Sequence, residues 1–171
     1  RRPLTIPRNP MKKRSTSKLA SNACPCGGFN ASAAYAQCCQ PYIDGARRAP
    51  TAEQLMRSRY TAYTLGEATY ILSTWHESTR PRQLDLDPPG APHGVRWLGL
   101  TVHNHSQAGE NQAQVEFTAR YREAGRAHRL KEKSRFVREN HQCGDGECEI
   151  EPNTGYLNNR SERKQKARPM G

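Results

Sequence analysis

The sequence is poor in hydrophobic and aromatic residues and has no long apolar run. Of its 171 residues, 34% are hydrophobic and 7% are aromatic, and the mean hydropathy is −0.98. No segment approaches the roughly 18 consecutive apolar residues of a membrane span. The basic N-terminus also lacks the apolar core of a secretory signal peptide. We therefore expect a cytoplasmic protein without membrane contact, whose natural start is Met11 and for which residues 1–10 are an upstream extension.

Acidic residues are scarce as well, with 16 Asp and Glu against 27 Lys and Arg, which gives a net charge of +11. The excess lies mainly at the ends, because residues 1–48 carry +8 and residues 51–140 carry only +3. A basic tail attracts polyanions through counterion release, so weak nucleic-acid binding through the tails is one interpretation. No aromatic residue lies among the N-terminal cations to stack on bases. This favours a solvated, disordered basic tail over residues 1–22.

Four of the six cysteines lie close together, in the runs CPCGG at residues 24–28 and CC at residues 38–39. Thiolates are soft ligands, and four of them fill a tetrahedral Zn²⁺ site completely, which leaves no open position for catalysis. In a cytoplasmic protein, such a cluster favours a metal over disulfides. We predict a structural zinc site in a module over residues 23–45, with metal-free thiols or a redox function as alternatives. The proposed ligands are Cys24, Cys26, Cys38 and Cys39.

Two motifs together resemble a known family. The cysteine spacing, with Tyr35 between the pairs, resembles the zinc motif at the C-terminal end of the SecA translocation ATPase. That motif, with LMRSRYTAY at residues 55–63 and TWHESTRP at residues 74–81, more closely resembles the YchJ-like family of uncharacterised bacterial proteins. The resemblance covers residues 23–140. The spacer between the cysteine pairs is longer than in the family, and the aromatic closing strand of the family is absent after Asn140.

The resemblance implies a SEC-C-type zinc module followed by a cystatin-like, nuclear-transport-factor-like domain over residues 51–140. Such a domain packs helices in the hollow of a curved antiparallel sheet. Since the SecA motif docks a chaperone and associates with ribosomes, the resemblance also implies a protein partner or the ribosome. Residues 141–171 do not follow the family pattern and are expected to form an atypical, poorly ordered polar tail.

Hydrophobic periodicity separately predicts helices at the start of the domain. Thr51 and Gln54 form a capping box, a helical apolar stripe follows them, and Gly66 ends this helix. A second helix is predicted over residues 68–75. In the cysteine module, residues 33–36 are expected to form one helical turn that delivers the second cysteine pair.

From Val95 the hydrophobic period changes to two. This pattern predicts one strand over residues 95–105 and a hairpin of two further strands, in which a two-residue turn at residues 124–125 would place Phe117 opposite Glu132. Helices followed by antiparallel strands indicate an α+β fold. The expected architecture is a cystatin-like cone with a small N-terminal zinc module.

The inward face of the predicted sheet carries polar residues. Glu132 and Ser134 share strand parity with apolar neighbours, and a carboxylate among apolar groups must be paired, protonated or functional. One interpretation is a pocket for a polar ligand, with Glu132 and His76 as acid–base candidates. The other, which we favour, is an ion pair that fixes helix against sheet. The pocket candidates are Arg57, Arg59, Tyr63, Trp75, His76, Glu132 and Ser134.

Two weaker patterns involve metal-binding residue types. His103 and His105 lie two apart on a predicted strand and should point the same way, which suits a metal, although hydrogen-bonded histidines are the favoured interpretation. Cys143 and Cys148, with His141 beside them, could form a disulfide or share a metal. Free thiols in the tail are the favoured interpretation of this pair.

Six cations alternate along the outer face of the predicted hairpin and could hold a nucleic-acid backbone. A solvated exterior, with Glu116 opposite Lys133, is the favoured interpretation. The six are Arg120, Arg122, Arg129, Lys131, Lys133 and Arg135.

No catalytic constellation is recognisable, since the sequence shows no Ser-His-Asp arrangement and no glycine loop of the kind that binds phosphate. We therefore assign no catalytic residue, and a non-catalytic role is favoured while enzymatic activity stays open. The first hypothesis is a zinc-binding adaptor or interaction module. The alternatives are a small-molecule-binding protein or enzyme that uses the cone pocket, and a weak, non-specific RNA or ribosome binder.

Overall fold

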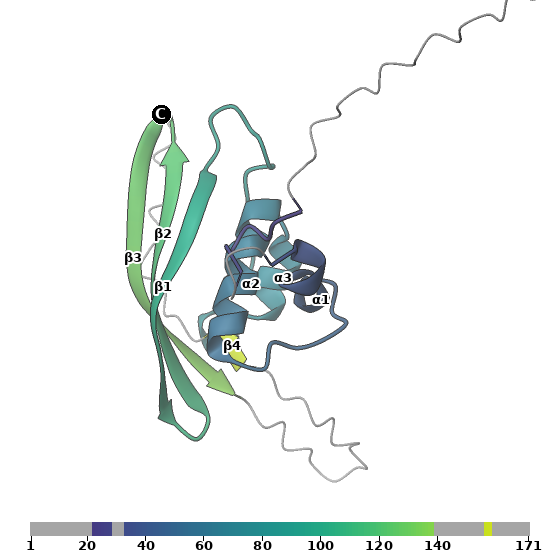
Figure 1. Ribbon diagram of the computed structural model, residues 1–171, viewed down its shortest axis with the longest axis vertical. Coiled ribbons are helices and arrows are strands. Elements are labelled where there is room, and N and C mark those ends of the chain that lie inside the picture. The colour runs from purple at the N-terminus through teal and green to yellow at the C-terminus, as the bar shows by residue number, and fades with distance from the viewer. Residues whose placement is uncertain (1–21, 29–32, 139–155, 159–171) are drawn as a thin grey trace, which may run out of the picture.

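The structure is a computed structural model that describes residues 22–28, 33–138 and 156–158. A curved antiparallel sheet is covered by helices on one face only (Figure 1). The long helix α2 (Ala52–Leu65) lies between the sheet and the short helix α1 (Gln40–Ile43) (Figure 1). The α+β fold, with helices in the hollow of a curved sheet and a cysteine module before them, is therefore confirmed.

Helix α2 begins and ends at the residues that the sequence indicates. The hydroxyl of Thr51 accepts a hydrogen bond from Gln54 N at 3.2 Å, which satisfies a backbone donor in the first turn. Gly66 follows the last turn with φ of 81°, a left-handed conformation that glycine adopts readily. The chain then turns into α3 (Ala68–Ser73), which ends two residues earlier than predicted, and into the 3-10 turn η2 (Glu77–Thr79).

The sheet has the order β1-β2-β3-β4, with β1 (Arg96–Gly109), β2 (Gln112–Glu123), β3 (Arg126–Arg138) and β4 (Tyr156–Asn158). Strands β2 and β3 form the predicted hairpin, and Phe117 pairs with Glu132 as expected. The turn residues Ala124 and Gly125 have φ of 47° and 79°. Two consecutive positive φ values are typical of the type I′ turn, which matches the twist of the strands.

Strand β1 differs from its prediction in length and in regularity. Its pairing with β2 shifts register at three places, one of them between Val102 and Asn104. A register shift of this kind inserts an extra residue and reverses the side-chain alternation beyond it. The expectation that His103 and His105 point the same way is therefore wrong. His103 Nε2 lies 2.7 Å from the Thr118 hydroxyl, whereas His105 Nδ1 lies 4.0 Å from a Glu53 carboxylate oxygen on α2.

Strand β4 is an element that the sequence patterns did not predict. Its three residues pair antiparallel with the end of β3, with Leu157 opposite Val137. Residues 156–158 thus add a short strand to the sheet from the part of the chain that does not follow the family pattern. Two predicted features lie outside the described residues. One is the basic tail of residues 1–22, of which the structure describes only residue 22. The other is the group of His141, Cys143 and Cys148.

One hydrophobic cluster joins the cysteine module, α2 and the inner face of the sheet. It contains all four cysteines of the module together with fully buried apolar residues such as Leu55, Val115 and Phe136. A second, smaller cluster holds Ile71 and Trp75 against the other side of α2. None of the helices in the described segments is both long and apolar enough to cross a lipid bilayer.

Candidate metal centre

The cysteine module is built from two short segments that meet through backbone pairing. Ala23 and Ala34 form an isolated antiparallel bridge, and Cys24 N donates to Ala33 O at 3.0 Å. The bridge brings the start of the first cysteine segment next to the residues that lead into the second. Gly27 N donates to Cys24 O at 3.0 Å, and this tight turn places the first cysteine pair on one side of the bridge.

The second cysteine pair is delivered by short helical turns. The 3-10 turn η1 (Tyr35–Gln37) lies two residues later than the helical turn expected over residues 33–36, and it leads directly into Cys38. Cys39 precedes α1, and the amides of Tyr42 and Ile43 donate to its carbonyl oxygen, each at 3.1 Å. The second pair is thus held by backbone hydrogen bonds on both sides.

The four sulfur atoms converge on one point. All of them lie within 4.8 Å of one another, and each cysteine is at most 9% exposed. Cys26 Sγ lies 3.5 Å from Cys24 Sγ and 3.6 Å from both Cys38 Sγ and Cys39 Sγ, and the last two are 3.8 Å apart. A tetrahedral ion with metal–sulfur bonds of about 2.3 Å holds its sulfurs about 3.8 Å apart. The cluster therefore has the size of a tetrahedral four-sulfur site, and its cysteines are free thiols rather than disulfides.

The electrostatics of the cluster also favour a cation. Hydrogen bonds from Cys26 and Cys39 hold the pKa of the Cys24 thiol far below its usual value, so one thiolate is stabilised by its neighbours. Burial and then the charge at Cys26 raise the pKa of Cys38 to about 12. Hydrogen bonds with Cys24 and Cys26, followed by burial, raise the pKa of Cys39. The protein groups alone thus favour the thiolate at Cys24 and oppose it at Cys38 and Cys39, and four thiolates together need a metal cation to offset their repulsion.

Two polar groups outside the cluster approach its sulfur atoms. The hydroxyl of Thr61, fully buried on α2, lies 3.6 Å from Cys24 Sγ. The backbone amide of Gly28 donates to Cys26 Sγ at 3.3 Å. Donors of this kind orient metal-bound thiolates and reduce their charge.

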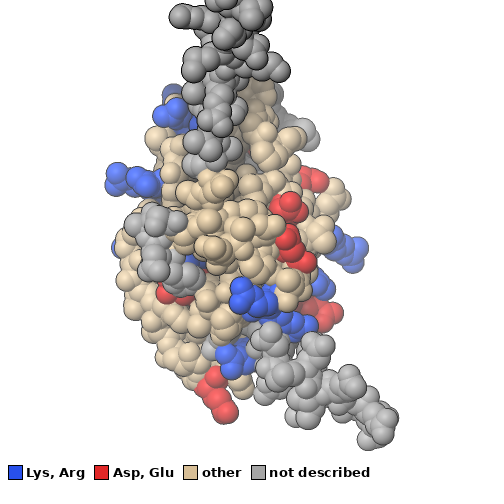
Figure 2. All heavy atoms as spheres, turned by 45° about the vertical axis from the view of Figure 1, so that its right-hand side comes forward, with Lys and Arg blue, Asp and Glu red and all other residues tan. Residues whose placement is uncertain are grey.

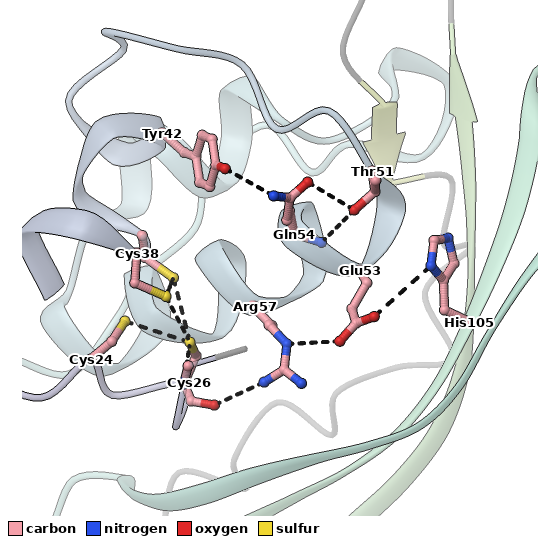
Figure 3. Close-up of polar contacts among 11 residues, drawn as sticks. Cys24, Cys26, Cys38, Tyr42, Thr51, Glu53, Gln54, Arg57 and His105 are labelled. Atoms are coloured by element: carbon pink, nitrogen blue, oxygen red, sulfur yellow. Dashed lines mark hydrogen bonds and ion pairs between the residues drawn. The ribbon is translucent and has the colours of Figure 1, made fainter. Parts of the chain in front are cut away.

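A chain of polar contacts ties the module to α2 and the sheet (Figure 3). Arg57 donates to the Cys26 carbonyl oxygen at 3.2 Å and to Glu53 at 2.9 Å, and the second oxygen of Glu53 faces His105 on β1 (Figure 3). In the first turn of α2, Gln54 donates to the Tyr42 hydroxyl at 3.2 Å. The module is therefore anchored along α2 rather than hanging from a flexible linker.

The structure divides the seven pocket candidates between three places. A cavity on the inner side of the sheet is lined by Arg59, Tyr63, Trp75 and Ser134. Arg57 lies at the cysteine module. His76 caps the 3-10 turn η2, where its Nδ1 lies 2.7 Å from the Ser78 hydroxyl.

Glu132 lies next to this cavity and is inward-facing, as its strand parity indicates. Ser134 donates to Glu132 Oε1 at 2.6 Å, so the carboxylate and the hydroxyl act as one hydrogen-bonded pair. The cavity is also lined by six residues that are not among the seven pocket candidates. Their only sequence signal is apolar periodicity, which indicates a core and not a pocket. They are Met56, Tyr60, Trp97, Phe117, Ala119 and Leu130.

The six cations of the hairpin are exposed on the face of the sheet that the described helices leave uncovered (Figure 1). Glu116 pairs with Lys133 in the strand register, but its carboxylate forms an ion pair with Lys131 at 3.5 Å. The Lys131 side chain is 71% exposed, so this pair is solvated.

Comparisons with known proteins agree with both parts of the molecule. The family model described as "YchJ, middle NTF2-like domain" matches residues 51–143. A UPF0225 protein of Cupriavidus metallidurans is 50% identical over 122 residues, which cover 71% of this chain and 80% of that protein. A UPF0225 protein of Methylibium petroleiphilum is 47% identical over 135 residues, which cover 79% of this chain and 93% of that protein.

Two solved structures of proteins that contain a SEC-C motif are similar over most of the chain. The protein from Psychrobacter arcticus is 27% identical with a TM-score of 0.63, over 81% of this chain and 80% of that one. The protein from Rhodopseudomonas palustris is 28% identical with the same TM-score of 0.63, over 82% of this chain and 97% of that one. The similarity thus extends over both the cysteine module and the cone.

Proposed function

Because the chain belongs to the YchJ-like family of UPF0225 proteins, whose solved relatives carry a SEC-C motif, we propose that it is a zinc-binding interaction module without catalytic activity. It works in the reducing cytoplasm, where its four thiols stay available to a metal. The observation that carries the proposal is the convergence of four buried sulfur atoms at the spacing of a tetrahedral site.

Zinc is favoured as the metal because of the ligand type and the burial. Four thiolates in a tetrahedron suit zinc or iron, and zinc sites of this kind stabilise small segments that have little core of their own. When bound, the ion would be held by Cys24, Cys26, Cys38 and Cys39 and would act structurally. With four protein ligands there is no open position for water or substrate, which supports a non-catalytic role.

The interaction role rests on how the module is presented. Its anchoring along α2 makes the surface around α1 rigid, and the exposed Arg47 and Arg48 lie in the segment after this helix. Figure 2 shows the helical side as a broad uncharged area with basic and acidic side chains around it. An uncharged centre with a charged margin suits a protein partner, free or on the ribosome.

Metal analysis of the purified chain tests whether the protein binds zinc. We expect one zinc ion per chain by mass spectrometry of the acid-digested protein, and substoichiometric zinc after Cys24→Ser. Cys148→Ser is the matched control and should keep one zinc, because Cys148 is not one of the four proposed ligands. Iron in place of zinc would overturn the choice of metal, and no metal in well-folded protein would overturn the site.

Sedimentation with purified ribosomes tests whether the module serves as an interaction surface. The zinc-loaded chain should sediment with ribosomes, and Cys24→Ser should abolish this, because the docking surface loses its shape with the metal. Glu132→Gln leaves the module intact and should sediment like the wild type. Equal sedimentation of the wild type and Cys24→Ser would contradict a role of the module in docking.

A second candidate function is favoured by the six exposed cations on the uncovered face of the sheet. Such a face could bind single-stranded RNA without sequence preference through the phosphate backbone. The double variant Lys133→Gln and Arg135→Gln should then weaken binding of a polyuridine strand and flatten its salt dependence. An interaction that depends on the zinc module, in contrast, should not respond to these two substitutions.

A further inference from the structure

The cavity between α2 and the sheet has the features of a ligand site. It has a volume of about 40 Å³ and is partly open to solvent. A single water needs roughly 10–15 Å³ of such space, so the cavity admits a group of several heavy atoms. Residues from α2, from the end of α3 and from all three long strands line it, as set out above.

Most of the wall is aromatic. The Trp97 ring packs edge-on against Tyr60 with centroids 5.6 Å apart, and against Tyr63 at 5.9 Å. Tyr63 and Trp97 are half-buried, whereas Tyr60 and Trp75 are buried at 3% and 5% exposure. The half-buried rings therefore lie towards the opening and the buried rings towards the floor. Flat rings favour a flat ligand, because stacked and edge-on contacts need a π face.

The floor carries one donor with an unmet hydrogen bond. The indole Nε1 of Trp75 is buried and has no partner among the described residues. A buried donor without an acceptor is costly and uncommon in native structures, so it indicates a missing water or ligand. The other polar groups of the wall are already engaged. Arg59 donates to Ile71 O at 2.7 Å and to the Thr74 hydroxyl at 2.8 Å, and Ser134 donates to Glu132.

The charges around the cavity are balanced. Arg59 lies over the Trp75 ring, with its guanidinium carbon 5.0 Å from the ring centroid, and the carboxylate of Glu132 lies behind Ser134. A cation in the wall and an anion next to it offset each other, so the cavity has no net charge for a ligand to neutralise. Burying a charged ligand without a partner is expensive, so this environment favours a neutral ligand.

We propose that this cavity binds a small neutral aromatic compound that carries a carbonyl group. The carbonyl oxygen reaches the floor and accepts a hydrogen bond from Trp75 Nε1, and the ring lies at the opening against the outer side of the touching Tyr63 and Trp97 rings. Nothing in this proposal depends on the metal, because no cysteine of the module lines the cavity.

Benzamide is the probe of choice, with benzoate as its charged match of the same shape. The chain contains two tryptophans, so a spectrum of the ¹⁵N-labelled, metal-loaded protein should show two indole N–H signals, and Trp75→Phe identifies the one from Trp75. Benzamide should shift this signal downfield in a saturable way, as expected for a new hydrogen bond. Benzoate should bind at least about tenfold more weakly, because its carboxylate would move from water into the cavity without a cation to pair with.

Two variants locate the site. Trp75→Phe keeps the ring but removes the donor and should weaken benzamide about three- to tenfold, the usual range for one neutral hydrogen bond. Ala119→Leu keeps the donor but fills the cavity from β2, and it should abolish binding. This variant therefore tests the location of the site even if Trp75→Phe fails to fold. Tyr42→Phe is the control, since Tyr42 lies on α1 away from the cavity, and it should bind like the wild type.

Three results would each overturn the proposal. The first is no saturable change in the Trp75 indole signal of the wild type up to the solubility limit of benzamide. The second is unchanged binding in a folded Ala119→Leu or Trp75→Phe protein, which would place the ligand elsewhere. The third is equal or tighter binding of benzoate, which would show that the cavity selects for charge.

Discussion

The cysteine module (residues 22–28 and 33–45) and the cone (residues 51–138 and 156–158) are held together by different means. In the module, the regular elements are η1, α1 and one isolated bridge. The buried residues at its centre are its four cysteines. In the cone, strands of 12 to 14 residues and a 14-residue helix bury aromatic and aliphatic side chains. A short segment cannot bury enough apolar surface to offset its loss of chain entropy. The comparison teaches that the module has little apolar core of its own, so the proposed metal would supply order that the cone obtains from packing.

Helix α2 contacts both the cysteine module and the apolar interior of the cone. Thr61 and Arg57 contact the cysteine segments, whereas Tyr60 and Arg59 face the cavity on the other side. The module therefore adds to the stability of α2, and α2 in turn fixes the module. The following predictions separate these contributions, from the largest expected effect to the smallest.

Removal of one central sulfur should affect the module far more than the sheet. We expect Cys26→Ser to lose the metal, because Cys26 Sγ contacts the other three sulfurs. Measured by hydrogen exchange, protection of the module amides should fall about 100-fold or more, while amides of β2 and β3 change by less than about threefold. Cys143→Ser serves as the matched control. An equal loss of protection in both regions would show that the cone also depends on the metal.

Alkaline pH should destabilise the cone through one buried and one half-buried tyrosine. Burial raises the pKa of Tyr60 and of Tyr70 to about 12, whereas both would ionise near 10 in the unfolded chain. Their contribution is complete below pH 10 and is lost as the pH rises from 10 to 12, by up to roughly 2–3 kcal/mol for each tyrosine. Urea unfolding at several pH values measures this loss.

The corresponding phenylalanine variants are the controls for this titration. Tyr60→Phe and Tyr70→Phe should each flatten the fall in stability between pH 10 and 12, because the ionising hydroxyl is gone. A fall of unchanged size in both variants would assign the alkaline loss to other groups.

The contact between module and helix should have an intermediate effect. Arg57→Met removes the hydrogen bonds to the Cys26 carbonyl and to Glu53, and we expect a loss of about 1–3 kcal/mol in the free energy of unfolding. Lys131→Met is the matched control, because this cation pairs with Glu116 while 71% exposed, and it should cost less than about 0.5 kcal/mol. If both variants lowered the free energy of unfolding by the same small amount, the hydrogen bonds of Arg57 would not contribute to holding the module.

The smallest effect is expected at the tip of the hairpin, far from the module. Ala124 has φ of 47°, a conformation that asparagine adopts more readily than alanine. Ala124→Asn should therefore raise the free energy of unfolding by up to about 1 kcal/mol without changing the metal content. Ala127→Asn, in the extended strand nearby, should not stabilise the protein. A destabilised Ala124→Asn protein would argue against the type I′ turn.

Local patterns in the sequence predict the parts of this fold that depend on neighbours along the chain. The start of α2 at Thr51, its end at Gly66 and the register of Phe117 with Glu132 follow from capping and turn chemistry within a few residues. The convergence of four sulfurs is also legible, because the two pairs are close in sequence and thiol chemistry is distinctive.

Features set by long-range packing are not predictable in this way. The opposite orientation of His103 and His105 arises from a register shift against β2, which leaves no mark in the alternation of β1 itself. The cavity brings together Met56, Trp97 and Leu130 from three separate elements, and each of them separately has the pattern of an ordinary core residue. Strand β4 is only three residues long, too short for a period to be recognised.

The register shifts of β1 have a consequence for the behaviour of the protein at high concentration. In the described part of the chain, β1 is the outer strand of the sheet, with β2 on its other side. A second molecule adding a strand there would find the ladder broken near Trp97, Val102 and Gln107, so its backbone could match only short stretches at a time. Interrupted templates of this kind stop the stepwise recruitment of further chains that leads to fibrils. The irregular strand thus protects an otherwise long, open border from polymerisation.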